Sequence, residues 1–452
     1  MHTAPSEAPT PPRPRTAAEI TPLLRLALPI VAGLAASTLI GVVDTLMIAP
    51  LGTVPLAAAA LTTSVIIIFY SALYGFLSAV GVEAAHRYGA EDADGVSAAL
   101  RAGLILALCA GVGGAAVMAA ILFALPLIGQ PTEVLAILGP YWFAMSALLI
   151  PFSVLMTISQ VLNAIDRPWT ATGFAFLGVV LNVPMNYVLI WGIGGWEGLG
   201  LLGAGLASLL SESLACGVAL WWLARSGRLR RRGVPAGLIP QLARDGVPLG
   251  IGYTGEGAAF ALVGVLLGLF GAVALASNQI VQAVGGVLYM LPLGMAAAVT
   301  IRVGQAIGAE ERARLRAIAR AALGLVTGWM AAVTVALILL GGTIADALSD
   351  DPEVVALATA MFVLVAIIQI ADGVQATAYG ALRGMTDFRW PTVITLCCYW
   401  LFALPLAGIL GFLFGLGPLG VWGGYGLGIF VAATLLPIRF WRLTKKRPGT
   451  IA

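Results

Sequence analysis

Charge is scarce in this sequence of 452 residues. Asp, Glu, Lys and Arg together make up 10% of it, against about 25% in ordinary soluble domains, and 60% of the residues are hydrophobic. A soluble core could not enclose that much apolar side chain, so the composition excludes a soluble globular protein. The four cysteines lie inside apolar runs without metal-ligand spacing, which predicts small, buried, reduced side chains (Cys109, Cys216, Cys397 and Cys398).

Signals for several other classes of protein are also missing. Residues 1–21 are polar and Pro-rich and show no cleavable signal peptide. The sequence has no Gly-Lys-Ser/Thr phosphate-binding loop, which argues against ATP-driven pumping within this chain, and no Ser, Cys or His constellation for hydrolysis. We therefore expect neither an enzyme nor a bound cofactor, and no nucleic-acid partner.

Apolar runs separated by short polar or Gly/Pro-rich segments dominate the sequence. Because about 20 apolar residues cross a bilayer, these runs predict an all-α membrane protein of twelve transmembrane helices. The helices are expected to begin near residues 22, 56, 99, 137, 169, 203, 246, 277, 318, 354, 390 and 420.

The basic residues are distributed very unevenly among the connecting segments. If the N-terminus is cytoplasmic, the inside segments contain all 24 Lys and Arg residues. The opposite loops, around Glu133, Glu197 and residues 346–353, carry acids and no base. This is the positive-inside asymmetry, and it predicts a multi-pass protein of the bacterial inner membrane with both termini in the cytoplasm.

The two halves of the chain repeat one another. Three landmarks recur 219 residues later and two recur 221 residues later: Pro29 and Pro248, Gly52 and Gly271, Gly89 and Gly308, then Asp166 and Asp387, Pro184 and Pro405. Six crossings return the chain to its starting side, so the repeat predicts two six-helix bundles related by a pseudo-two-fold axis along the membrane normal. The predicted parts are a cytoplasmic tail (1–21), an N-lobe (22–224), a cytoplasmic linker (225–245), a C-lobe (246–441) and a second cytoplasmic tail (442–452). Duplication of this kind favours a transporter that works by alternating access, although channels and lipid scramblases also use duplicated scaffolds.

Four acids fall inside predicted spans without a Lys or Arg at similar depth: Asp44, Glu212, Glu256 and Asp372. An unpaired charge at the bilayer centre costs roughly 2.5 to 3.5 kcal/mol, so each acid should face a cavity, carry a proton or bind a cation. Such a site can exchange a proton or Na⁺ for a cationic organic substrate. Gln369 and Gln375 flank Asp372 and indicate a polar helix face, whereas the serines around Glu212 leave open whether they simply satisfy it by hydrogen bonds.

Polar side chains elsewhere in the spans allow two interpretations each. Asn182 and Asn186 lie on one face of their helix and flank Pro184, which frees a backbone carbonyl; this set suits a hard cation, or the amides form ordinary interhelical hydrogen bonds. Glu83 and Arg302 occupy equivalent repeat positions and form either a gate-like ion pair or two separate interfacial charges. A cavity for bulky organic cations would use aromatic, Met and amide side chains. The candidates in the spans are Tyr70, Tyr74, Tyr253, Gln282, Tyr289, Met290, Gln369 and Tyr379. Packing within the bundle or contact with lipid would equally explain these side chains.

Four segments of the sequence together resemble a known family. They are Val42-Val-Asp-Thr-Leu-Met47, Gly246-Val-Pro-Leu249 with Glu256, Ala298-Val-Thr-Ile-Arg-Val-Gly304, and Asp372 followed by Gly380-Ala-Leu-Arg-Gly-Met-Thr-Asp387. From about Leu24 to Trp441 the chain resembles the multidrug and toxic compound extrusion (MATE) transporters, in particular their NorM-like branch. The resemblance implies two bundles that form a V and export of diverse, often cationic drugs, driven by inward movement of Na⁺ or H⁺.

The resemblance also implies which residues bind the coupling ion. Glu256 and Asp372 match the acids of a C-lobe cation site. Asp44 matches an N-lobe acid that works with helix-5 asparagines and a helix-6 hydroxyl, here Asn182, Asn186 and Ser208. Na⁺ binding is accordingly expected at Glu256, Asp372 or Asp44. This sequence departs from the pattern at Ile368, where some relatives carry a tyrosine, and at the additional acid Glu212.

Our hypothesis from the sequence is a monomeric antiporter that exchanges small-molecule drugs and organic cations for Na⁺ or H⁺ among membrane lipids. The main alternative is a flippase of related fold for lipids or lipid-linked oligosaccharides, but such a cavity should need buried cations for a phosphate headgroup, and the deep charges are acidic. A receptor or scaffold would need a large soluble domain or binding loop, which the short connections do not provide.

Overall fold

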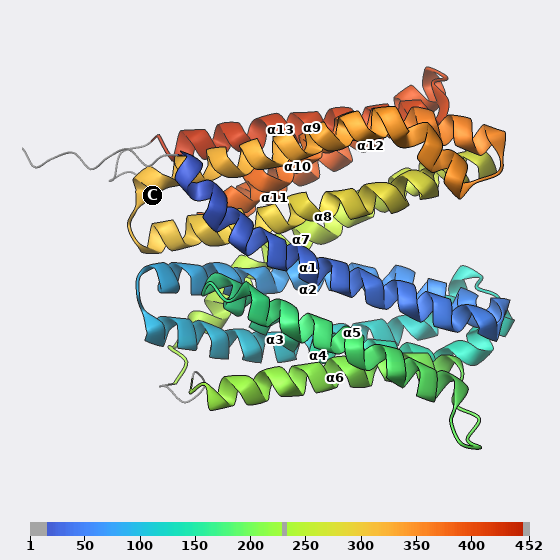
Figure 1. Ribbon diagram of the computed structural model, residues 1–452, viewed down its shortest axis with the longest axis horizontal. Coiled ribbons are helices and arrows are strands. Elements are labelled where there is room, and N and C mark those ends of the chain that lie inside the picture. The colour runs from blue at the N-terminus through green and yellow to red at the C-terminus, as the bar shows by residue number, and fades with distance from the viewer. Residues whose placement is uncertain (1–15, 228–232, 446–452) are drawn as a thin grey trace, which may run out of the picture.

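The computed structural model describes residues 16–227 and 233–445, and it contains helices and no strand in those ranges (Figure 1). Twelve helical segments there are long and apolar enough to cross a membrane, which confirms the predicted all-α, twelve-span fold class. The main helices are α1 (Thr16–Ile48), α2 (Thr53–Gly89), α3 (Ala93–Ile121), α4 (Thr132–Ala164), α5 (Pro168–Trp191), α6 (Leu201–Arg225), α7 (Leu238–Gly268), α8 (Ala272–Gly308), α9 (Leu315–Leu348), α10 (Pro352–Gly384), α11 (Arg389–Leu396) and α13 (Gly417–Leu443).

Most helices begin a few residues before the predicted positions, because the apolar run marks only the part of a helix that lies in hydrocarbon. The difference is largest for α7, which begins at Leu238 and not near residue 246. Its first turns carry polar side chains such as Arg244 and Asp245, which hid the helix from an analysis based on hydropathy. The eleventh span is irregular, because α11 continues through a π-helical segment (Cys397–Ala403), α12 (Leu404–Gly408) and a second π-helical segment (Ile409–Leu413).

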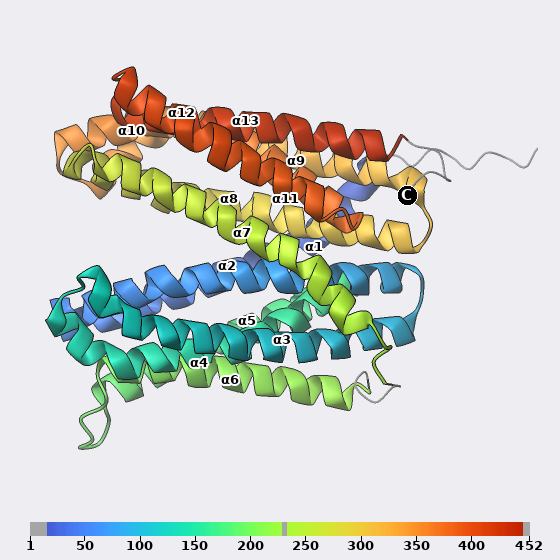
Figure 2. The same ribbon diagram turned by 180° about the vertical axis from the view of Figure 1, so that it is seen from behind.

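The helices form two bundles, and the first helix of each bundle begins in contact with the other bundle. Helices α1–α6 form the N-lobe and α7–α13 form the C-lobe (Figure 1). The first turns of α1 pack on α8 and α9 before the helix crosses to α5 in its own lobe. Helix α7 makes the reciprocal crossing, starting beside α2 and α3 (Figure 2). This exchange is what a pseudo-two-fold axis between the lobes requires.

One end of the molecule, called here the basic face, bears the start of α1, the end of α13 and the α2–α3, α4–α5, α8–α9 and α10–α11 connections. The repeat is visible there in the backbone. The four non-glycine residues with positive φ in the described ranges are Glu91 (56°), Asp166 (57°), Glu310 (58°) and Thr386 (60°). They form two pairs of equivalent turns, after α2 and α8 and after α4 and α10.

Glycines bring the two lobes into backbone contact near the basic face. A β-carbon on Gly89 would collide with the carbonyl of Gln305, and one on Gly308 would collide with the carbonyl of His86. The same kind of close approach recurs where α2 meets α7 and where α8 meets α1, at Gly75, Gly246 and Gly294.

The lobes separate toward the opposite face. All hydrogen bonds and close glycine contacts between lobes within residues 16–227 and 233–445 lie in the half of the molecule nearest the basic face. Beyond that half, the axes of α7 and α8 diverge from those of α1 and α2 (Figures 1 and 2). The two lobes therefore form a V that is closed at the basic face.

Candidate cation and substrate sites

Three helices bring an acid, two amides and a hydroxyl together in the N-lobe. Asp44 on α1 accepts hydrogen bonds from Asn186 Nδ2 at 2.5 Å and from Ser208 Oγ at 3.0 Å. Asn182 connects the two donors, because its Nδ2 donates to Ser208 Oγ (3.3 Å) and its Oδ1 accepts from Asn186 (2.9 Å). All four residues that the sequence analysis assigned to this site are thus in mutual contact.

The two asparagines owe their position to the local sequence of α5. They are spaced four residues apart, so both side chains lie on one helix face, and both are 0% exposed. Pro184 between them cannot donate to the carbonyl four residues earlier. Asn186 Oδ1 is buried without a hydrogen-bond partner. An amide oxygen without a donor, next to a carboxylate, is free to coordinate a cation. Hard cations prefer oxygen ligands of this kind.

Glu212 lies one turn of α6 beyond the polar cluster of Asp44, Asn182, Asn186 and Ser208. It stands four residues after Ser208, on the same face, and its Oε2 would lie 3.4 Å from a β-carbon on Gly178 of α5. The neighbouring serines do not satisfy its carboxylate, since Ser208 Oγ donates to Asp44 and Ser211 Oγ donates to a backbone carbonyl. Ser208 and Ser211 therefore donate their hydroxyls elsewhere, and both interpretations of Glu212 stay predictions.

In the C-lobe, Glu256 of α7 contacts a residue that the sequence analysis missed. The hydroxyl of Tyr399 lies 3.2 Å from Glu256 Oε1 and 2.6 Å from Gln375 Oε1 of α10. The ring of Tyr399 stacks on Tyr425 of α13, with centroids 5.8 Å apart. Tyr399 thereby places a hydroxyl next to Glu256. Ile368 of α10, which stands where some relatives carry a tyrosine, is apolar and cannot provide one.

The π-helical segment Cys397–Ala403 explains why Tyr399 escaped notice. A π turn rotates the following side chains relative to a regular helix, so periodicity along the apolar run could not assign Tyr399 to an inner face. The only available signal was an aromatic residue with a polar end inside a span. Such a residue needs a hydrogen-bond partner when buried.

Asp372 and Gln369 lie one turn apart on α10, as expected from their spacing. Asp372 is partly buried, and the hydroxyl of Tyr289 on α8 lies 3.5 Å from its backbone oxygen. Gln369 is 8% exposed, and its Oε1 has no hydrogen-bond partner. Gly285 of α8 leaves the space that the Gln369 amide occupies. The polar helix face predicted for α10 is therefore present and lies inside the C-lobe.

The remaining cavity candidates fall into two groups. Tyr253 and Tyr379 lie toward the basic face, where Tyr253 contacts Tyr74 of the N-lobe (centroids 5.2 Å apart) and Tyr379 bonds to Thr392 at 2.9 Å. Gln282, Met290 and Tyr70 are partly buried in their lobes.

The gate-like ion pair between Glu83 and Arg302 is not formed. Glu83 pairs with Arg87 on its own helix at 2.8 Å. Arg302 Nη2 instead contacts Glu19 Oε2 at 3.3 Å, and Arg314 Nε contacts Glu19 Oε1 at 2.8 Å. Glu19 precedes the first predicted span, so the hydropathy analysis placed it in a tail and missed this contact between α1 and the C-lobe.

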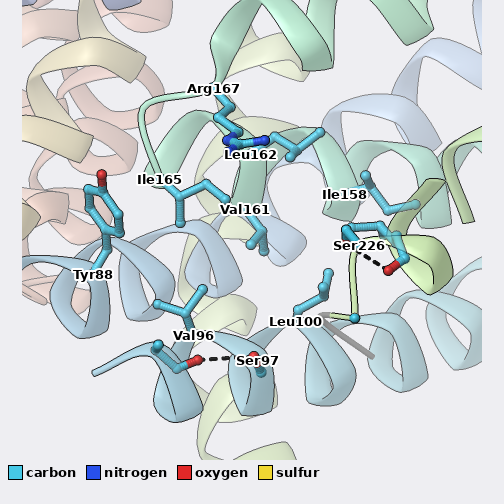
Figure 3. A pocket seen from close by; sticks show the side chains of 13 residues that line it. Tyr88, Val96, Ser97, Leu100, Ile158, Val161, Leu162, Ile165, Arg167 and Ser226 are labelled. Atoms are coloured by element: carbon cyan, nitrogen blue, oxygen red, sulfur yellow. Dashed lines mark hydrogen bonds between the residues drawn. The ribbon is translucent and has the colours of Figure 1, made fainter. Parts of the chain in front are cut away.

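Four surface cavities formed by the described residues, each of about 450 to 570 Å³, are not lined by any of the four acids Asp44, Glu212, Glu256 and Asp372. The cavity drawn in Figure 3 has a volume of about 450 Å³ and lies at the basic face of the N-lobe. Most of the side chains that line it are apolar, and Tyr88, Ser97 and Arg167 add polar groups. None of the predicted site residues lines it. The buried polar clusters of the two lobes, and not this cavity, contain the candidate site residues.

Comparison with known proteins identifies the family. The model of the MatE family matches residues 29–188 and 248–409, which are the cores of the two repeats. The chain belongs to the MatE family. This MATE chain is 32% identical to a protein of Bradyrhizobium diazoefficiens named probable multidrug resistance protein NorM, over 97% of this chain and 96% of that protein. It is equally 32% identical to the protein of that name from Deinococcus radiodurans, over 97% of this chain and 98% of that one.

Solved structures confirm the MATE fold. A crystal structure of a MATE protein in a bent conformation matches with a TM-score of 0.87 and 21% identity, over 96% of this chain and 97% of that one. An outward-facing multidrug resistance MATE transporter matches with a TM-score of 0.86 and 20% identity, over 95% and 97%. The family match and the NorM relatives confirm the predicted resemblance to NorM-like MATE proteins. They also confirm the prediction of a transporter and not an enzyme.

Proposed function

We propose that this MATE protein exports organic, often cationic, small molecules by antiport against Na⁺ or H⁺. The observation that carries the proposal is the cluster of Asp44 with Asn182, Asn186 and Ser208, because it places a carboxylate and an unpartnered amide oxygen inside the N-lobe. Glu256 and Asp372 offer a second acidic site in the C-lobe. The multidrug resistance names of the relatives support small organic molecules as the substrates.

The arrangement of the lobes suggests how the exchange works. The lobes are joined near the basic face and apart at the opposite face, so the acids are approached from the open end of the V. We propose that the basic face is cytoplasmic, in a bacterial inner membrane, following the positive-inside rule. Binding of an ion from outside then competes with the organic cation for the same carboxylates, releases the drug and biases the lobes toward opening at the basic face.

Na⁺ and H⁺ make different demands on this site. Within residues 16–227 and 233–445, no group of three His, Cys, Asp or Glu side chains could hold a metal ion. One carboxylate with amide and hydroxyl oxygens suits Na⁺, and a carboxylate alone suffices for a proton. Both ions therefore remain in the proposal.

The test is efflux of a fluorescent organic cation from proteoliposomes under an imposed Na⁺ gradient or, separately, a pH gradient. Asp44→Asn, Glu256→Gln and Asp372→Asn keep the shape of each side chain and remove its charge. We expect ion-dependent efflux from the intact protein and at least a tenfold loss in Asp44→Asn. Absence of efflux under either gradient would instead favour the lipid flippase.

A further inference from the structure

Arg383 is a buried cation to which the proposed exchange assigns no task. It lies in the last turn of α10 and is 3% exposed. Its Nε and Nη2 donate to Thr300 Oγ1 at 3.1 and 2.9 Å, and its Nη1 donates to the hydroxyl of Tyr253 at 2.7 Å. The guanidinium carbon also lies 5.9 Å from the centre of the Tyr253 ring.

Among the residues that the structure describes, no acid pairs with this charge. None of the ion pairs found in residues 16–227 and 233–445 includes Arg383. The nearest acid along the chain, Asp387, is held through both carboxylate oxygens by Arg439, at 2.6 and 3.1 Å. The buried cation is instead stabilised by neutral hydroxyl oxygens that accept its hydrogen bonds, by the face of an aromatic ring and by the negative end of the α10 dipole. Its positive potential therefore reaches the surrounding low-dielectric protein.

The charge lies between the C-lobe acids and the basic face. Along α10, Arg383 follows Asp372 by about 16 Å, taking about 1.5 Å per residue. On α7, its partner Tyr253 precedes Glu256 by one turn on the side of the basic face. A cation that left either acid toward the basic face would have to approach Arg383.

Arg383 also lies directly behind the closed seam between the lobes. Tyr253, which covers the guanidinium, packs edge-on against Tyr74 of α2. Next to this pair, Gly75 and Gly246 bring the backbones of α2 and α7 into contact. The seam is thus closed by rings and backbone, and a cation stands behind it.

The fold itself does not require a charge at this position. Helices α4 and α10 end at Ala164 and Gly384, so the structure aligns these helix ends at an offset of 220 and not at the 221 of the sequence landmarks. The position equivalent to Arg383 is then Asn163, a neutral residue whose Oδ1 has no hydrogen-bond partner. The same helix end therefore forms in the N-lobe with an amide. A charge present in one repeat only indicates a task that belongs to the C-lobe.

We propose that Arg383 is an electrostatic barrier that prevents small cations held at Glu256 and Asp372 from leaking through the closed seam to the basic face. The proposal rests on the ion coupling proposed above. Like charges in a low-dielectric environment repel strongly, and a fixed arginine in a narrow passage excludes cations without obstructing neutral solutes. Such a barrier keeps the ion gradient for exchange, because an ion that crosses without drug is wasted.

The experiment compares intact protein, Arg383→Met and Arg383→Lys in proteoliposomes without drug. Uptake of Na⁺, protons, chloride and a neutral solute is measured under matched gradients. Arg383→Met removes the charge and keeps an unbranched side chain, whereas Arg383→Lys keeps the charge and loses the forked hydrogen bonds. We expect Arg383→Met to raise the cation leak about tenfold and to leave chloride and neutral-solute leak unchanged, while Arg383→Lys stays near the intact protein.

The leak assay does not depend on drug transport, so it fails or succeeds separately from the efflux test of Asp44, Glu256 and Asp372. An equal rise of cation, chloride and neutral-solute leak in Arg383→Met would show a merely mechanical plug and overturn the proposal, as would no rise at all. Arg383→Gln, which can still bond to Thr300, replaces methionine if that variant does not fold. If both neutral variants fail to fold and lysine folds, the charge serves folding and the barrier is refuted.

Discussion

His86 and Gln305, which occupy equivalent positions in the two repeats, make the same contact across the lobe interface. His86 Nε2 lies 2.8 Å from the carbonyl of Gly384, and Gln305 Nε2 donates to the carbonyl of Ala164 at 3.0 Å. Each side chain at the end of α2 or α8 thus binds the end of α10 or α4 in the other lobe. Together with the glycine contacts beside them, these two bonds close the basic face symmetrically.

A larger residue at Gly308 should open this face. In Gly308→Ala the new methyl group meets the carbonyl of His86, so the lobes must move apart there. We expect spin labels placed on α2 and α8 at the basic face to show a longer distance in a larger fraction of molecules. Gly324→Ala on α9 is the matched control, since a β-carbon there has no neighbour within 4 Å. Unchanged distances in Gly308→Ala would show that the seam absorbs the methyl group.

Neutralising Glu19 should weaken the attachment of α1 to the C-lobe. Glu19 is 3% exposed and contacts both Arg302 and Arg314, so Glu19→Gln leaves two arginines without their shared carboxylate. We expect a loss of about 1.5–3 kcal/mol in the stability of the closed basic face, the range for hydrogen bonds to charged groups. The measurement is the midpoint of thermal unfolding together with labelling of a cysteine at the basic face. Glu311→Gln, which removes a more exposed partner of Arg314 on the same side, should have little effect.

Asn186 should set the affinity of the N-lobe acid for its ion. Asn186→Ala removes the 2.5 Å hydrogen bond to Asp44 and the buried unpartnered oxygen beside it. We expect the ion concentration for half-maximal efflux to rise at least fivefold, with the maximal rate less affected. Thr45→Val is the control, because that neighbouring hydroxyl bonds only to Gly41 of its own helix. Equal ion dependence in Asn186→Ala and the intact protein would remove this amide from the ion site.

The hydroxyl of Tyr399 should matter to transport and its ring to stability. Tyr399→Phe keeps the stacking on Tyr425 and removes the contacts of the hydroxyl with Glu256 and Gln375. We expect a several-fold rise in the ion concentration required for efflux and a loss of about 1 kcal/mol in stability, typical of one hydrogen bond. Tyr425→Phe should leave ion dependence unchanged. The same shift in both variants would point to packing of the aromatic pair and away from the hydroxyl.

Much of the fold could be predicted because a bilayer imposes simple rules. Apolar length gave the twelve spans, and the repeated landmarks such as Pro29 and Pro248 gave two equivalent lobes. The N-lobe cluster could also be predicted, because Asn182 and Asn186 lie on one helix face by spacing alone, Asp44 is an acid inside a span, and the family resemblance added Ser208. The segregation of Lys and Arg predicted which connecting segments lie at the same end of the molecule. The sequence could not show which of those segments contact one another.

Contacts between segments distant in sequence were decided only by the tertiary structure. Glu19 reaches Arg302 and Arg314 because α1 crosses into the other lobe, and a crossing leaves no periodic signal in the sequence. Tyr399 reaches Glu256 because a π turn rotates its side chain. Arg383, which the sequence analysis counted among the basic residues of the inside segments, is buried because Tyr253 and Thr300 of two other helices pack against it. Hydropathy records how much each segment avoids water, but the partner of a buried polar group depends on which helices pack together, and that is a property of the assembled bundle.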